Sequence, residues 1–454
     1  MDLHLFFLPM TAMGHLIPML HLARLFAGRR GVRATVVAPS TVISLIQPTL
    51  HHPIQLLPLG ELALITHPQN NAITPEMAAE IDRLEVPFLQ LLRDHSADCI
   101  VADLLYPWAS SVAEELGIPS VPFSGIGCFS SVILKTLGQL AIPDHDDRRP
   151  FLLPGLPDEI HLARPQLPDV VTHPSDFVKR ALANGEKRYG MIVNTFDDLE
   201  RDYIAHAKKS DGGRIWCVGP LSLSQPKEAA FNFSDELMQW LDSKKETNSV
   251  LYLCFGSLGL LVAAQLREIA LGLQASGVEF VWVVRDAGDS AEWLPEGFDV
   301  GVIGAGKGMI VKDWVPQPSI LNHPAVGGFV THCGWNSCVE AVAAGVPMVT
   351  WPLHSEQFFN ELLVVDLLGI GVPAGATVCS IRAEERNLVS AESIRNAVAE
   401  VMGSGDEAAA RRKRAARLRE ASAKATEEGG TSNSDLDHLL NDLINLKANR
   451  LIAH

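Results

Sequence analysis

Residues 331–347, THCGWNSCVEAVAAGVP, place His332, Asn336, Ser337 and Glu340 between an apolar run and a run of small residues. If GGFVTH is a strand and SCVEAVAAG a helix, CGWN is the turn at the carboxyl end of a strand, where open α/β sheets bind ligands. The first N–H groups of such a helix have no intrahelical acceptor, and the helix dipole makes this end partly positive. The turn is therefore suited to binding a phosphate group without a metal.

The side chains of this turn support that interpretation. Ser337 fits either an N-cap or a hydroxyl donor to phosphate, Asn336 offers an amide, and His332 can donate to an anionic oxygen. Glu340 lies three residues after Ser337, which is the spacing of a capping box. It is equally suited to accept hydrogen bonds from a pair of sugar hydroxyls, and the spacing leaves both roles open.

Two flanking segments add groups that suit a nucleotide sugar. Trp314 follows a strand-like run; a lone tryptophan usually belongs to the core, but its flat face can also stack on a nucleobase. In WPLHSEQ the polar pair Glu356-Gln357 follows the next strand. Adjacent hydrogen-bonding side chains suit a ligand with many hydroxyls, although the pair also fits an ordinary helix start.

The amino-terminal half offers a candidate general base. His15 follows the first strand-like run and begins a helix pattern, and Asp103 ends the later run DCIVAD. A single histidine is weak evidence among 16, and an aspartate after an apolar run is also a common helix start. Together they would form a base and its orienting carboxylate, in which Asp103 fixes the tautomer and stabilises the imidazolium.

The surrounding elements predict an α/β protein. Strand-length apolar runs alternate with longer helical patterns in both halves, which indicates mainly parallel sheets and two Rossmann-like domains. Proline, serine and polar residues cluster at 218–236. We therefore expect an amino-terminal domain over 1–225, a carboxyl-terminal domain over 226–430, and a final helix over 431–454. The helical pattern would allow this helix to pack on either domain, and we assign it to the amino-terminal one.

The composition of the chain limits the classes of binding partner that are expected. With a formal charge of −16, the protein repels polyanions, so neither nucleic acid nor an anionic membrane is expected as a partner. No run reaches the length of a membrane span, and the start lacks the basic region of a signal peptide. The seven cysteines are odd in number and scattered, which indicates reduced thiols and a cytoplasmic location.

Three further motifs are set aside. GVIGAGKG (301–308) has P-loop spacing, but Gly308 replaces the hydroxyl residue and a strand-like run follows, so a flexible loop is expected. DHDD (144–147) contains the Asp-x-Asp of metal-dependent sugar transferases, yet prolines and arginines flank it as in a solvated loop. No Gly-x-Gly-x-x-Gly follows a recognisable strand, which disfavours a dinucleotide oxidoreductase.

Residues 314–357 resemble the 44-residue donor signature of plant family 1 UDP-sugar glycosyltransferases. The match in register includes Trp, Gln, His-Cys-Gly-Trp-Asn-Ser, Glu, Trp-Pro and the final Glu-Gln. LCFGS (253–257), VNTF (193–196) and the chain length are similar as well. The resemblance implies the GT-B fold, in which two Rossmann-like domains face each other across a cleft.

The resemblance also implies residue roles. Trp314 would stack on uracil while the Val315 backbone reads its edge. The other donor-site residues would hold the ribose (Gln317, Glu340), the diphosphate (Ser257, His332, Gly334, Asn336, Ser337) and the hexose (Trp335, Glu356, Gln357). A final glutamine in this signature usually accompanies glucose. His15 and Asp103 match the catalytic dyad of the family in local context.

The expected reaction follows from these roles. His15 takes a proton from an acceptor hydroxyl, the oxygen attacks the anomeric carbon in line, and UDP leaves, so that an α-linked donor gives a β-glucoside. No cofactor or metal is implied; UDP-glucose is the co-substrate, the other partner is a small hydrophobic acceptor, and a monomer is the expected state. The amino-terminal region resembles a branch that acts on flavonoids, triterpenoids and steroids.

Departures from the family pattern concern the acceptor side. Candidate acceptor-pocket residues are Met13, Phe123, Ile126 and His354; Met13 and His354 replace residues common in relatives, and Gly125-Ile126 stand where a threonine or serine often touches the sugar. These changes leave carbon-linked transfer open. A nucleotide-sugar-binding protein without transfer and a metal-dependent transferase using DHDD also remain as alternatives.

Overall fold

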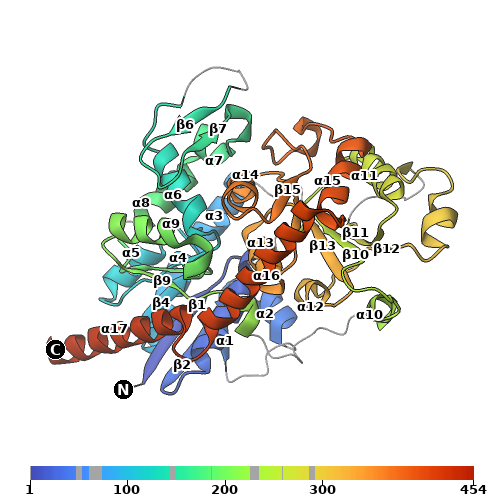
Figure 1. The fold of residues 1–454 in the computed structure, drawn as a ribbon. Coiled ribbons are helices and arrows are strands. Elements are labelled where there is room, and N and C mark those ends of the chain that lie inside the picture. Colours follow the sequence, from blue (N-terminus) through green and yellow to red (C-terminus); the bar gives the residue numbers. More distant parts are fainter. Residues whose placement is uncertain are drawn as a thin grey trace. The chain divides into compact units, whose positions relative to one another are not determined.

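The computed structural model describes residues 2–47, 54–60, 74–142, 149–185, 187–224, 235–257, 259–285 and 292–453. The chain divides into two compact units (Figure 1). The first unit comprises Met1–Val132, His173–Ala229 and Ala423–His454, and the second comprises Ile133–Thr172 and Ala230–Ser422. The sheets of both units are mainly parallel, as the alternating pattern predicts.

The first unit contains two parallel sheets. One has the order β3-β2-β1-β4, built from β1 (Leu3–Leu8), β2 (Val32–Ala38), β3 (Gln55–Pro58) and β4 (Cys99–Ala102). The other has the order β5-β8-β9, built from β5 (Phe123–Ser124), β8 (Met191–Val193) and β9 (Ile215–Cys217). Isolated bridges from Ile100 to Ser120 and from Asp103 to Phe123 link them. The strand-like runs of the amino-terminal half are thus confirmed as strands.

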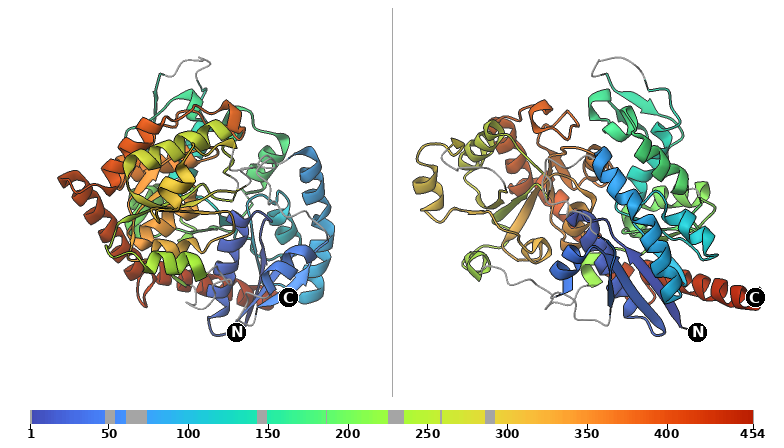
Figure 2. Two further views of the ribbon diagram at one scale, coloured as in Figure 1. Left: turned by 90° about the vertical axis from the view of Figure 1, so that its right-hand side faces the viewer. Right: turned by 180° about the vertical axis from the view of Figure 1, so that it is seen from behind.

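Helices follow these strands in the order expected of right-handed crossovers between parallel strands. They are α1 (Met13–Ala27), α2 (Ser40–Ile46), α3 (Pro75–Arg83), α4 (Glu85–His95), α5 (Ala109–Glu115), α6 (Cys128–Leu137), α8 (Asp176–Gly185) and α9 (Asp197–Ser210). Helix α6 begins in the first unit and ends in the second. Figures 1 and 2 show α1 beside the blue strands β1 and β2.

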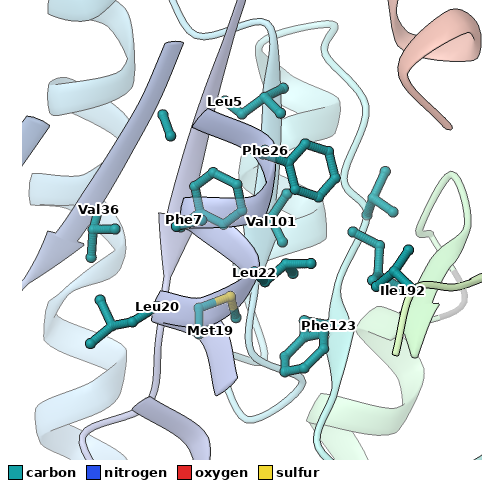
Figure 3. Packing of buried hydrophobic residues seen from close by; sticks show 14 of the residues in the cluster. Leu5, Phe7, Met19, Leu20, Leu22, Phe26, Val36, Val101, Phe123 and Ile192 are labelled. Atoms are coloured by element: carbon teal, nitrogen blue, oxygen red, sulfur yellow. The ribbon is translucent and has the colours of Figure 1, made fainter. Parts of the chain in front are cut away.

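The core of the first unit forms between α1 and the two sheets. Figure 3 shows Phe7 of β1 and Phe26 of α1 in edge contact, with ring centroids 5.7 Å apart. Met19 and Leu22 of α1 lie with Phe123 of β5 in the same cluster. Burying such side chains stabilises a fold by about 1.5–3 kcal/mol each. This cluster therefore holds α1 against β1 and β5.

The final helix, α17 (Thr431–Ala453), belongs to the first unit and lies beside β9. Leu436, Leu439, Leu440 and Leu443 have helical spacing and join the core cluster of that unit. Polar contacts fix the start of the helix: Ser432 Oγ donates to the Gly219 carbonyl at 2.6 Å. The helix that the sequence pattern predicts over 431–454 is therefore confirmed as α17.

The second unit has a six-stranded parallel sheet in the order β12-β11-β10-β13-β14-β15. Its strands are β10 (Val250–Cys254), β11 (Glu279–Val283), β12 (Gly308–Val311), β13 (Val326–Thr331), β14 (Met348–Thr350) and β15 (Gly371–Pro373). Its helices are α7 (Asp169–Thr172), α10 (Asp235–Asp242), α11 (Ala263–Ser276), α12 (Gln317–Leu321), α13 (Trp335–Ala344), α14 (Gln357–Leu362), α15 (Ala391–Met402) and α16 (Asp406–Thr426). Helices α11 and α15 pack together over one face of the sheet and share its core cluster.

The division differs from the expected boundaries over residues 423–430, which group with the first unit, and over residues 133–172, which group with the second. The latter segment contains an antiparallel hairpin, β6 (Phe151–Leu153) and β7 (Ile160–Leu162), which the sequence pattern did not indicate. One hydrogen bond that attaches this segment to the rest of the second unit runs from the Cys379 N–H to the Pro165 carbonyl at 2.7 Å. A contact between residues so far apart in the chain leaves no local sequence signal.

The P-loop-like segment is described and does not form a phosphate-binding loop. Asp299–Ile303 form a π-helical turn rather than the expected flexible loop, and β12 begins at Gly308, so a strand follows Lys307 where a P-loop would open a helix. The motif DHDD lies outside the described residues. Within the part of the chain that the structure covers, no helix is long and apolar enough to cross a membrane.

Candidate active site

The first pair of predicted residues meets at the carboxyl ends of adjacent strands. His15 lies in the first turn of α1, after β1, and Asp103 follows β4 directly. The Asp103 N–H donates to the Leu8 carbonyl at 3.0 Å, which fixes the aspartate beside the end of β1. His15 Nδ1 lies 2.7 Å from Asp103 Oδ2.

Burial distinguishes the two members of this pair. The Asp103 side chain is 3% exposed, whereas the His15 side chain is 35% exposed. The second carboxylate oxygen, Oδ1, accepts the Leu105 N–H at 3.0 Å, so the carboxylate cannot rotate without losing a bond. The aspartate is thus fixed and buried while the imidazole reaches solvent, as required of an orienting carboxylate and a base that meets its substrate.

The loop after β5 lies beside His15. A Cβ added at Gly125 would be 3.6 Å from the His15 ring, so Gly125 is in the immediate vicinity of the imidazole. Met13 and Ile126 are partly buried. Phe123 is 1% exposed and packs in the core, so it supports the loop from below rather than offering a surface to an acceptor.

Glu200 holds the far end of this loop, a role that sequence patterns did not reveal. Its buried carboxylate accepts the N–H groups of Cys128 at 3.1 Å and Phe129 at 2.7 Å, the first residues of α6. Burial raises the pKa of Glu200, and these hydrogen bonds lower it in part. An acceptor at a helix start satisfies N–H groups that have no intrahelical partner, so Glu200 anchors the end of the 124–127 loop.

The opening motif forms the expected turn between β13 and α13. Helix α13 begins at Trp335, and its N-cap is Gly334, without a side-chain cap. Ser337 therefore lies in the first turn and is not the N-cap. The N-cap role considered for Ser337 is thus wrong, and so is a capping box formed by Ser337 and Glu340. The first-turn N–H groups at 335–337 remain suited to an anion, because no intrahelical carbonyl precedes them.

Two glycines enclose His332 at this turn. A Cβ at Gly256 or at Gly334 would lie 2.6 Å or 2.4 Å from the imidazole, so neither position accepts a side chain without displacing the ring. Gly256 also has a φ of +76°. Nδ1 of His332 is buried with no hydrogen-bond partner among the described residues, and burial lowers the pKa of His332 to about 4. The ring is neutral at pH 7 and retains a hydrogen-bonding nitrogen for a ligand.

Gln317 joins the residues expected at the ribose. Its Nε2 donates to Ser337 Oγ at 3.0 Å and to Glu340 Oε2 at 2.8 Å. Behind it, the Tyr252 hydroxyl donates to Gln317 Oε1 at 3.4 Å. One amide thus connects α12 to the start of α13, and the structure brings three predicted donor residues into a single hydrogen-bonded group.

Burial in this group raises the pKa of Glu340 to about 7, against the smaller opposing effect of the Gln317 hydrogen bond. A carboxyl with a raised folded pKa destabilises the protein when ionised: the cost is absent below the unfolded value near 4.5 and complete above pH 7. We therefore expect Glu340→Gln to raise the melting temperature at pH 8.5, by removing a cost of about 3 kcal/mol.

The difference between wild type and Glu340→Gln should shrink as the pH is lowered to 5.5, measured by scanning calorimetry of the unliganded protein. Glu246→Gln removes the same charge from an exposed loop and serves as the control. An equal difference at both pH values would contradict the raised pKa of Glu340.

Trp314 is 38% exposed, unlike a core tryptophan. The Arg285 guanidinium lies over its ring, 4.6 Å from the centroid. Arg285 lies two residues after the end of β11, so it comes from the carboxyl edge of the sheet. Val315 is 7% exposed, and its carbonyl accepts the Gln317 N–H at 3.0 Å.

The residues expected at the hexose are mostly buried. Trp335 is 3% exposed and Gln357 is 4% exposed. Gln357 Oε1 accepts the N–H groups of Leu353 at 2.9 Å and His354 at 3.1 Å, so this oxygen already orders the loop before α14. His354 is 9% exposed, and burial with the nearby His332 lowers its pKa to about 3.

Asn360 connects this loop to the opening turn. Its Nδ2 donates to the Cys333 carbonyl at 2.8 Å and to Glu356 Oε1 at 3.3 Å. Cys333 has a φ of +60°, which is unusual for a residue with a side chain, and the bond from Asn360 holds it there. Ser257 and Asn336, both partly exposed, lie after β10 and in the first turn of α13.

Sequence patterns missed Arg285, Tyr252, Asn360 and Glu200. The position of Arg285 could have been found from the sequence, because it closely follows a strand-like run, at the edge of the sheet where ligands bind. The other three are polar residues within ordinary strand or helix patterns, and their roles arise from contacts across the fold. Among the described residues, no group of three or more His, Cys, Asp or Glu side chains is arranged to hold a metal.

Comparison with known proteins identifies the family of the chain. The family described as UDP-glucoronosyl and UDP-glucosyl transferase matches residues 226–404. UDP-glucose flavonoid 3-O-glucosyltransferase 7 from Fragaria ananassa is 39% identical, over 99% of this chain and 98% of the relative. Residues of the second unit thus carry the family match, and the similarity extends over both units.

Solved structures agree in fold. Glycyrrhiza uralensis UGT73P12 complexed with glycyrrhetinic acid 3-O-monoglucuronide has a TM-score of 0.91 at 35% identity, covering 100% of this chain and 98% of that one. Medicago truncatula UGT71G1 complexed with UDP-glucose has a TM-score of 0.81 at 29% identity, covering 97% and 98%. The protein therefore belongs to the plant family 1 UDP-sugar glycosyltransferases and is a UDP-glycosyltransferase of the GT-B class.

Proposed function

We propose that the protein transfers glucose from UDP-glucose to a hydroxyl group of a small apolar acceptor, of the flavonoid, triterpenoid or steroid class. The observation that carries transfer, rather than binding alone, is the 2.7 Å contact between His15 Nδ1 and Asp103 Oδ2. A protein that only held the nucleotide sugar would have no use for a buried carboxylate oriented on a solvent-reaching imidazole.

The proposed reaction is a single displacement with inversion. His15 Nε2 takes the acceptor proton while the acceptor oxygen forms a bond to the anomeric carbon, and Asp103 stabilises the resulting imidazolium. The bond from that carbon to the phosphate oxygen breaks, and its electron pair leaves with UDP. The product is a β-O-glucoside, and the proton on His15 returns to solvent.

The donor roles of the second unit follow the same logic. The diphosphate charge would be held by the first-turn N–H groups of α13, His332, Asn336 and Ser337, without a metal ion. Trp314 and Val315 would hold uracil, and Gln317 with Glu340 would hold the ribose. Glu356 and the amide nitrogen of Gln357 would contact the glucose hydroxyls, since the oxygen of Gln357 already bonds the loop.

Glucose as the sugar and an apolar acceptor are supported by relatives. The Fragaria ananassa relative is named for UDP-glucose and a flavonoid, and the Glycyrrhiza uralensis structure contains glycyrrhetinic acid 3-O-monoglucuronide. We further propose a cytoplasmic monomer. All seven cysteines are unpaired thiols, as is usual in a reducing compartment.

The test is mass spectrometry of products after incubation with UDP-glucose, a metal chelator and a pooled panel of flavonoids, phenolics, triterpenoids and steroids. We expect a hexose increment on at least one compound, equal in rate with and without the chelator. Loss of the product in chelator would show that a metal takes part. Fragmentation that keeps the sugar attached through carbon would establish C-transfer, and tight UDP-glucose binding without any increment would favour a binding protein.

A further inference from the structure

The first unit contains a cavity of about 440 Å³ that is separate from the His15–Asp103 pair. Its wall includes Asp98, Tyr189 and Arg214, which lie at or just before the starts of β4, β8 and β9. His15 and Asp103 lie after strands β1 and β4, at their carboxyl ends. Because these strands are parallel, the cavity and the catalytic pair occupy opposite edges of the sheets.

The cavity wall is rich in cations. Five cationic side chains line it, against two carboxylates: Lys187, Arg188, Arg214, Lys447 and Arg450 face Asp98 and Glu114. The protein as a whole carries a formal charge of −16, so the charge of this cavity wall is opposite in sign to the net charge of the protein. A wall of this kind attracts small anions even though the protein's overall field repels them.

Three carboxylates pair with four of these five cations: Glu114 with Lys187, Asp211 with Arg188, and Asp98 with both Lys447 and Arg450. Asp98 alone accepts from Lys447 at 2.7 Å and from Arg450 at 2.8 Å, and it also accepts the His4 N–H at 2.9 Å. The Asp98 side chain is 5% exposed, whereas those of Lys447 and Arg450 are 21% and 26% exposed. Two cations thus share one buried anion, and both retain a solvent-accessible side.

Arg214 provides the clearest excess of positive charge. Its guanidinium lies over the Tyr189 ring, 4.7 Å from the centroid, and Tyr189 stacks on Trp216. No ion pair holds Arg214 among the described residues, whereas Lys187 pairs with Glu114 at 2.9 Å and Arg188 pairs with Asp211 at 2.5 Å. A guanidinium positioned by an aromatic ring keeps its hydrogen-bond donors available to an anionic oxygen.

We propose that this cavity binds a small multivalent anion of the phosphate-ester class. Lys447 and Arg450 come from α17, and Arg214 comes from the segment before β9, so a bound phosphate group would link the end of α17 to the sheet. Binding would therefore stabilise the docking of α17. The cavity volume lies within the range of small-molecule sites and leaves room for the organic part of an ester.

The test compares three full-length proteins: wild type, Arg214→Glu, and Arg395→Glu as the charge-matched control. Arg395 is exposed on α15 in the second unit and is outside the cavity. The probe is sodium tripolyphosphate, with sodium chloride at equal ionic strength as the reference. Any binding of the probe at the UDP-sugar site contributes equally to all three proteins, because both substituted positions lie outside the donor signature.

We expect tripolyphosphate to raise the melting temperature of wild type and Arg395→Glu by an additional shift on the order of 2–4 °C over Arg214→Glu. Hydrogen exchange of the 441–453 segment should also slow with the probe in the first two proteins and not in Arg214→Glu. Equal shifts in Arg214→Glu and Arg395→Glu, or unchanged exchange at 441–453 in wild type, would overturn the proposal.

Discussion

Replacement of His15 by alanine should reduce glucosyl transfer by about 10²- to 10⁴-fold, the range that a positioned general base contributes. UDP-glucose affinity should be unchanged, because His15 lies in the first unit and the donor residues lie in the second. The measurement is kcat with a fixed acceptor, together with the UDP-glucose dissociation constant from calorimetry on the same preparation.

Two further variants sharpen this result. His438→Ala removes an exposed histidine of α17 and should leave kcat as it is. Asp103→Asn keeps the size of the orienting side chain but removes its charge, so kcat should fall without a change in donor affinity. Full activity in His15→Ala would refute the assignment of the base, and a parallel loss of donor binding would point to a structural role.

Replacement of Trp314 by alanine should weaken UDP-glucose binding about 5- to 150-fold, which corresponds to the stacking of one base on an aromatic ring. The exposed ring, held under Arg285 at the edge of the sheet, is placed for that contact. UDP should weaken to the same degree, because it carries the same base. Titration calorimetry with both ligands measures the effect, and Trp314→Phe should recover part of it.

The chain offers a matched control for Trp314. Trp240 is another partly exposed tryptophan of the second unit with a cation over its ring, since Lys244 Nζ lies 3.6 Å from the centroid. Trp240→Ala removes the same side chain and the same kind of contact outside the donor signature. If Trp240→Ala and Trp314→Ala bound UDP equally well, uracil stacking on Trp314 would be untenable.

The sequence predicted those features that depend on residues close together in the chain. Strand-length apolar runs and helical apolar patterns predict most strands and helices of the parallel sheets, because a strand buried on both faces is apolar along its whole length. The donor turn was predictable for the same reason: β13, the turn and α13 are consecutive in the chain. His15 and Asp103 are far apart in sequence, but each lies beyond the carboxyl end of a strand, and the adjacent parallel strands β1 and β4 bring these ends together.

What the sequence could not show depends on distant contacts. The grouping of 133–172 with the second unit depends on bonds such as that between Cys379 and Pro165. Phe123 resembles a pocket residue in sequence but lies in the core, because the side chains of a strand alternate between its two faces. The pairing of Gln317 with Ser337 and Glu340 likewise requires α12 and α13 to be in contact.

The most direct test of the account is the anomeric configuration of the product, read from the proton NMR spectrum of the purified glucoside made from UDP-glucose. A single displacement by an acceptor that His15 has deprotonated inverts the α-linked donor, so the anomeric proton should show the large diaxial coupling of a β-linkage, with its carbon bonded to oxygen. An α-linked product would contradict direct attack, and with it the role proposed for the His15–Asp103 pair.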